Sequence, residues 1–120
     1  MNKTTKAETD YSLFINAFND MTTVVHDNAI KHGWWEEDRN DGEMIALMHS
    51  ELSECLEGLR AGNPPSDKIP EFSCAEEELS DCIVRIMDTA KARGYNIGAA
   101  IVAKHLYNLK RSYKHGGKTF

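Results

Sequence analysis

The sequence predicts an all-α protein, a four-helix bundle within a single domain over residues 9–115. Apolar residues recur every three to four positions in four stretches, turn-forming residues separate these stretches, and no alternating strand pattern or repeat occurs. At 120 residues the chain has the length of one domain. Residues 1–8 and 116–120 are expected to be flexible tails.

Glycines, prolines and capping residues set the expected helix boundaries. Gly33, Gly62 and Gly94 each follow an amphipathic stretch, where glycine commonly ends a helix. The prolines of residues 63–70 forbid a helix there, and Asn96 is a candidate N-cap. The expected helices cover residues 9–32, 43–61, 71–93 and 96–113.

Composition narrows the class of protein. The chain is 41% hydrophobic and 28% charged, and no apolar run approaches the ~20 residues of a membrane helix. The first residues lack the apolar core of a signal peptide. The three cysteines form no CxxC motif, and this pattern favours reduced thiols in a cytoplasmic protein. A net charge of −5 argues against a polymeric nucleic acid partner.

Two acidic pairs are the main indication of function. Glu51 and Glu54 lie three residues apart in the second expected helix, and Glu78 and Asp81 repeat this spacing in the third. In a helical projection, each pair flanks the apolar stripe of its helix on the same side. A short link makes the two helices antiparallel neighbours, so the four carboxylates are expected to open onto one cleft. The stripes contain Met44, Ile45, Met48, Leu52, Cys55, Leu56 and Leu59 in one helix, and Phe72, Ala75, Leu79, Cys82, Ile83, Ile86 and Ala90 in the other.

A hard divalent cation is the natural partner of four converging carboxylates. All-oxygen ligation favours Mg²⁺, with Mn²⁺ as a substitute, and no Glu-x-x-His motif of a di-iron site occurs. The plainer alternative is two solvated acidic helix faces. The remaining acidic residues of these helices are expected to lie at the surface, although Glu57 or Glu77 could assist the metal. They are Glu43, Glu57, Glu76, Glu77 and Asp88.

The fourth helix carries a cationic counterpart. Lys104, Asn108 and Arg111 share one polar face in projection, which Lys114 and His115 would extend. A lysine, an amide and an arginine suit phosphate oxygens. The alternative is a basic surface that the negative end of the helix dipole favours.

Taken together, these motifs resemble the MazG-like, all-α nucleoside triphosphate pyrophosphohydrolases. The resemblance covers about residues 20–118 and implies a MazG-type fold, homodimers or homotetramers, and Mg²⁺-dependent cleavage of a (deoxy)nucleoside triphosphate to monophosphate and pyrophosphate. It also implies that the acidic residues bind metal and that the lysine and asparagine contact phosphates or sugar. The matching motifs are Glu51-x-x-Glu54, Glu78-x-x-Asp81 and Lys104-x-x-x-Asn108.

Family members similar to dCTP pyrophosphatase place a histidine and a tryptophan against the base. His26 and Trp35 match that arrangement by their spacing from the first acidic pair, although Trp34 is adjacent. The alternatives are that Trp35 is a hydrophobic cap on the bundle and that His26 is a core or surface histidine. Two other functions stay open: a phosphoribosyl-ATP pyrophosphohydrolase, and a non-catalytic nucleotide-binding or interaction module. Apolar residues outside the main stripe of the first helix favour a homo-oligomer.

Overall fold

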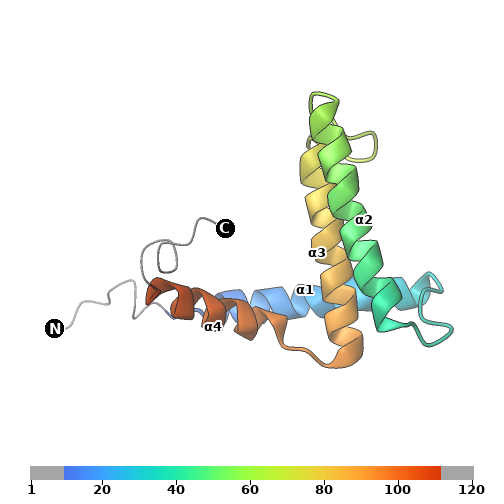
Figure 1. Ribbon diagram of the computed structural model, residues 1–120. Helices are drawn as coiled ribbons and strands as arrows, with labels where there is room; N and C mark the ends of the chain where they lie inside the picture. The colour runs from blue at the N-terminus through green and yellow to red at the C-terminus, as the bar shows by residue number, and fades with distance from the viewer. Residues whose placement is uncertain (1–9, 112–120) are drawn as a thin grey trace. The chain divides into compact units, whose positions relative to one another are not determined.

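Four α-helices make up the part of the chain that the computed structural model describes, residues 10–111 (Figure 1). These residues contain no strand, only a β-bridge between Pro65 and Ser73, so the all-α prediction is confirmed. The expected tails, the expected helix ends at Thr9 and Tyr113, and Lys114 and His115 lie outside the described residues. The helices are α1 (Ser12–Lys31), α2 (Asp41–Arg60), α3 (Cys74–Arg93) and α4 (Ile97–Leu109).

Side-chain caps determine where the helices begin. Asn40 caps α2 by accepting a hydrogen bond from the backbone N–H of Glu43, so α2 begins at Asp41, two residues earlier than predicted. The predicted start of α3 at residue 71 was wrong, because Ser73 and Glu76 form a capping box that starts the helix at Cys74. The predicted N-cap of α4, Asn96, is confirmed, since its side chain accepts a hydrogen bond from the backbone of Ala99.

The end of α4 differs from the prediction. The helix ends at Leu109 with Lys110 as its C-cap, so Arg111 lies beyond it. The prediction that Lys104, Asn108 and Arg111 share one face of this helix was therefore wrong for Arg111. Only Lys104 and Asn108 lie on α4, one turn apart.

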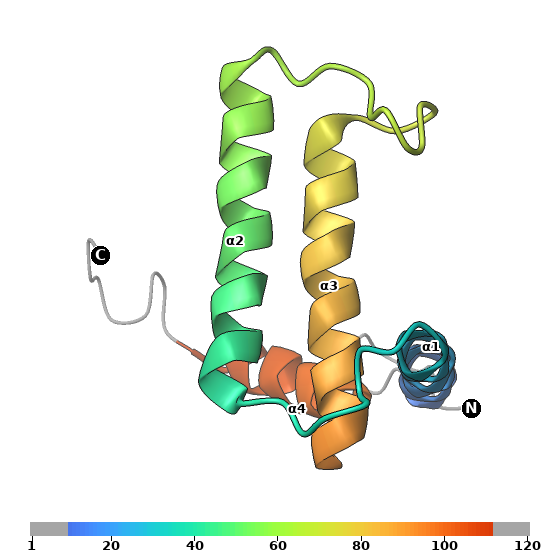
Figure 2. The ribbon, with the colours of Figure 1, turned by 90° about the vertical axis from the view of Figure 1, so that its right-hand side faces the viewer.

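The described residues divide into two compact units, one of residues 22–95 and a second of residues 10–21 and 96–111. In the first unit α2 and α3 lie side by side and antiparallel, as predicted (Figure 2). Arg93, at the end of α3, donates through Nε to Asp41 at the start of α2, over 2.7 Å. The single domain predicted over residues 9–115 stays a prediction.

The seam between α2 and α3 differs from the predicted apolar stripe. The buried residues of α2 are Met44, Glu51 and Cys55, separated by seven and four positions as in a coiled-coil seam. Relative to the predicted orientation, α2 is rotated so that Glu51 lies in the seam. Several residues of the predicted apolar stripes are exposed as a result. The stripe residues of the two helices that are about half exposed form two apolar strips, Ile45, Leu52, Leu56 and Leu59 on α2 and Leu79 and Ile83 on α3.

In the second unit, the first part of α1 packs against the start of α4 at Gly98. The amide of Asn19 donates to Asn96 Oδ1 over 2.9 Å and accepts from the backbone N–H of Gly98 over 3.3 Å. A Cβ atom on Gly98 would lie 2.8 Å from Asn19 Oδ1, so the close approach of the two helices depends on glycine.

Candidate metal and nucleotide site

Carboxylate oxygens from α2 and α3 converge in two overlapping groups. Glu51, Glu54 and Glu78 form the first group, and Glu77, Glu78 and Asp81 form the second. Within each group, one oxygen per residue lies within 4.8 Å of the others. These five residues are called the acidic cluster below. The cluster brings together all four carboxylates that the sequence singles out, and Glu77 joins them.

The two acidic residues of α2 occupy different environments. The side chain of Glu51 is only 9% exposed because it lies in the seam, whereas Glu54, one turn later, is exposed. The spacing of three residues therefore spreads the cluster from the interior to the surface. Glu57 belongs to neither group and instead forms a surface ion pair with Arg60 at 2.7 Å.

The crowded carboxylates shift one another's proton affinity. Burial, together with a hydrogen bond and the charge of Glu54, raises the pKa of Glu78 to about 7. The hydrogen bond with Glu51 raises the pKa of Glu54, and burial raises that of Asp81. Burial also acts to raise the pKa of Glu51, but hydrogen bonds with Glu54 and Arg85 outweigh it, so the pKa lies below its ordinary value.

One oxygen at the centre of the cluster lacks a partner. Among the described residues, the Oε2 atom of Glu78 is a buried polar side-chain atom with no hydrogen-bond partner. Such an atom is costly in a folded protein unless a ligand or ion satisfies it. Because Glu78 belongs to both groups and every surrounding ligand atom is a carboxylate oxygen, the residues fit a hard divalent cation such as Mg²⁺ or Mn²⁺.

Arg85 is a member of the site that the sequence analysis missed. Its Nε donates to Glu51 Oε2 over 2.6 Å, which joins α3 to α2 across the seam. Arg85 follows Asp81 by four residues and therefore shares its helical face, a signal that the sequence already contained.

A loop residue positions Glu77. Ser66 is almost fully buried, and its hydroxyl donates to Glu77 Oε1 over 2.5 Å. The same hydroxyl oxygen accepts from the backbone N–H groups of Lys68 and Ile69, at 3.2 and 3.1 Å. The loop between α2 and α3 is thereby attached to the acidic cluster.

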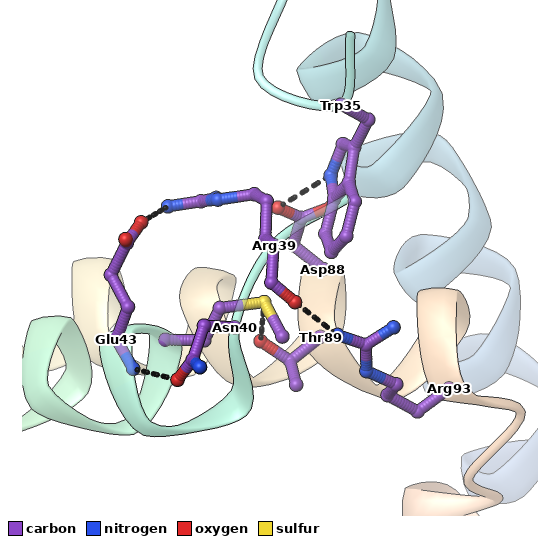
Figure 3. Close-up of polar contacts among 8 residues, drawn as sticks. Trp35, Arg39, Asn40, Glu43, Asp88, Thr89 and Arg93 are labelled. Carbon is purple, nitrogen blue, oxygen red and sulfur yellow. Dashed lines mark hydrogen bonds and ion pairs between the residues drawn. The ribbon is translucent and has the colours of Figure 1, made fainter. Parts of the chain in front are cut away.

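His26 and Trp35 lie together around an aspartate. The indole N–H of Trp35 donates to Asp88 Oδ1 over 2.9 Å (Figure 3), and His26 Nδ1 lies 2.7 Å from the same oxygen. The two rings meet edge to face with centroids 5.3 Å apart. Asp88 was expected to lie at the surface, but its side chain is only 13% exposed because it serves both partners. These three residues are called the aromatic cluster.

The environments of the two tryptophans differ. Trp34 is 56% exposed, whereas Trp35 is part of the aromatic cluster. The guanidinium of Arg39 lies over both rings, 5.4 and 5.5 Å from their centroids. Of the two, Trp35 is the one whose orientation is fixed by hydrogen bonds.

Lys104, Asn108 and Arg111 belong to the second compact unit. Lys104 Nζ lies 4.6 Å from the centroid of the Tyr107 ring, and the Arg111 guanidinium lies 5.8 Å from it. Both cations thus contact the same exposed aromatic ring. Their predicted role in binding phosphate stays a prediction.

No protein-family model, curated protein or solved structure matches the chain. The similarity to MazG-like pyrophosphohydrolases therefore rests on the motifs alone. Within residues 10–111, no helix is both long and apolar enough to cross a membrane.

The raised pKa of Glu78 predicts how the stability of the metal-free protein varies with pH. A carboxyl group whose pKa is higher in the folded state stabilises the fold at low pH, and this contribution is lost as the pH rises toward about 7. In EDTA, Glu78→Gln should therefore melt a few degrees above the wild type at pH 8, and the difference should disappear near pH 5. Thermal unfolding, followed by circular dichroism, measures the melting temperatures at both pH values. Glu57→Gln removes a similar charge outside the cluster and is the control; equal pH dependence in all three proteins would contradict the prediction.

Asp88 should stabilise the protein through its two hydrogen-bond partners. Removal of the carboxylate in Asp88→Ala leaves the Trp35 N–H without its acceptor, at a cost of about 1–3 kcal/mol in the free energy of unfolding. Urea unfolding measures this cost. In a Trp35→Phe background the same substitution should cost less, because the shared hydrogen bond is already absent. Equal costs in both backgrounds would show that the hydrogen bond between Trp35 and Asp88 contributes nothing. Asp27→Ala, at an exposed position of α1, is the control.

Proposed function

We propose that the chain is a Mg²⁺-dependent hydrolase that cleaves a (deoxy)nucleoside triphosphate between its α and β phosphates. The products are a nucleoside monophosphate and pyrophosphate, and the role is house-cleaning of the cytoplasmic nucleotide pool. The observation that carries the proposal is the convergence of the acidic cluster on the buried, unpaired oxygen of Glu78. A divalent cation, which prefers oxygen ligands, would offset the repulsion between these carboxylates and the cost of burying them.

The proposed reaction divides the work among residues of the chain. Glu51, Glu54, Glu78 and Asp81 would hold Mg²⁺, and the ion would supply charge neutralisation for the triphosphate and a lowered pKa for a nearby water. A carboxylate of the acidic cluster orients that water and accepts its proton. The water oxygen bonds to the α-phosphorus, and the bond from this phosphorus to the bridging oxygen breaks as pyrophosphate leaves. From the sequence motif alone, Lys104, Asn108 and Arg111 are proposed as donors to phosphate or sugar oxygens.

The aromatic cluster is the proposed contact for the base. Asp88 follows Asp81 by two helical turns on the same face of α3, a separation of about 10 Å along the helix. A nucleotide whose phosphates bind at the acidic cluster can therefore reach the rings of His26 and Trp35 with its base. Stacking against an aromatic ring accepts any base, so this contact alone selects none.

Self-association into a homodimer or homotetramer is part of the proposal. The apolar strips on α2 and α3 leave six large hydrophobic side chains about half exposed on one hairpin. Contiguous apolar surface of this kind commonly marks an interface, and a second copy of a helical hairpin offers a matching face.

The test is a pyrophosphate-release assay with each common NTP and dNTP, and with phosphoribosyl-ATP, in the presence of Mg²⁺. We expect turnover of at least one free nucleotide. Glu78→Ala should lower kcat/KM at least about 100-fold while the helical circular dichroism signal is retained, because the shared metal ligand is lost. Glu57→Gln should behave like the wild type, since that residue lies outside the cluster.

The alternatives give different results in the same assay. Exclusive turnover of phosphoribosyl-ATP would favour the second enzyme activity. The absence of pyrophosphate release from every substrate would favour a non-catalytic binding module. Full activity of Glu78→Ala would refute the proposed role of the acidic cluster.

A further inference from the structure

Among the described residues, two cations contact the acidic cluster. Arg85 donates a hydrogen bond to Glu51, whereas Lys68, in the loop before α3, lies 4.0 Å from Glu77 Oε2. The side chain of Arg85 is 33% exposed, whereas that of its partner Glu51 is 9% exposed. The guanidinium therefore extends from a buried carboxylate toward solvent. Burial raises the pKa of Asp81, one turn earlier on α3, and the charges of Lys68 and then of Arg85 oppose that rise.

The contact with Glu51 uses only one edge of the guanidinium. The bond to Glu51 comes from Nε, at 2.6 Å, and within residues 10–111 the terminal nitrogens of Arg85 have no hydrogen-bond partner. These nitrogens carry four of the five N–H donors of an arginine. Their planar, paired arrangement matches the oxygens of a phosphate group.

A metal ion at the acidic cluster would change the balance of charge around Arg85. Glu51 is both the partner of Arg85 and one of the three carboxylates of the first group. A divalent cation and a guanidinium that share one carboxylate repel each other, and an anion that contacts both relieves this repulsion.

We propose that Arg85 binds the phosphates of the substrate, and afterwards the pyrophosphate product, through its terminal nitrogens while its Nε holds Glu51 in place. This inference rests on the proposed function and adds a residue of the first unit to the phosphate contacts. It makes binding of metal and of phosphate cooperative, because each reduces the charge that opposes the other. The sequence indicated such a role for Lys104, Asn108 and Arg111 and not for Arg85.

The experiment compares two titrations by calorimetry on the full-length protein, one with Mn²⁺ alone and one with pyrophosphate at saturating Mn²⁺. The proteins are the wild type, Arg85→Gln, Arg85→Lys and the control Arg60→Gln, whose arginine forms a surface pair on the same hairpin. We expect Arg85→Gln to weaken pyrophosphate binding about 10- to 100-fold, the effect of losing charged hydrogen bonds. Its affinity for Mn²⁺ should be equal or higher, because a competing cation is gone. Arg85→Lys keeps the charge but loses the paired N–H donors of the guanidinium, so its affinity for pyrophosphate should lie between those of the wild type and Arg85→Gln. Arg60→Gln should bind pyrophosphate like the wild type.

Other results would overturn the inference. Equal losses of Mn²⁺ and pyrophosphate affinity in Arg85→Gln would mean that Arg85 merely supports Glu51. Unchanged pyrophosphate binding in both Arg85 variants, with a wild type that releases pyrophosphate from a nucleotide, would refute the role of Arg85 and leave the proposed function standing. A wild type that neither binds pyrophosphate nor releases it would refute both. If Arg85→Gln does not fold, Arg85→Lys decides. Unchanged pyrophosphate binding in that variant would show that the paired N–H donors of the guanidinium are not used.

Discussion

The ion pair between Glu51 and Arg85, in the seam of α2 and α3, is the interaction on which the polar chemistry of the hairpin depends. A carboxylate as buried as Glu51 requires a partner, and Arg85 supplies it across the seam at 2.6 Å. Partly buried ion pairs contribute little net stability compared with apolar packing, so a charge at this position is better explained by function than by stability. With Glu51 inside, the spacing of three residues brings Glu54 to the surface, and Glu78 meets both from α3.

One face of α3 connects the two clusters. Asp81, Arg85 and Asp88 follow one another at intervals of four and three residues, so they form a row along the helix. The first belongs to the acidic cluster, the second joins α3 to α2, and the third holds His26 and Trp35. Displacement of α3 along its axis would move all three together, so the same helix would set the distance between a bound metal and a bound base.

Much of the hairpin, and the start of α4, could be predicted from the sequence, because the signals for both are local. The acidic spacing, the proline-containing link and the N-cap Asn96 depend on neighbours along the chain. The exact seam could not be predicted, since a projection cannot say how far a helix rotates when Glu51 gains a partner as strong as Arg85. Asp88 was missed for a related reason: its partners lie 62 and 53 residues away, and nothing in its own helix distinguishes it from a surface aspartate. The start of α3 was misplaced because the capping box of Ser73 and Glu76 was overlooked, although both residues are visible in the sequence.

The central claim is that the acidic cluster binds a divalent cation, and the most direct measurement is anomalous diffraction from crystals grown with Mn²⁺. The account predicts an anomalous peak bounded by Glu51, Glu54 and Glu78, with Glu78 Oε2 as a ligand and Arg85 beside it. A map from saturated crystals with no peak at these carboxylates, or with Mn²⁺ bound only elsewhere, would contradict it.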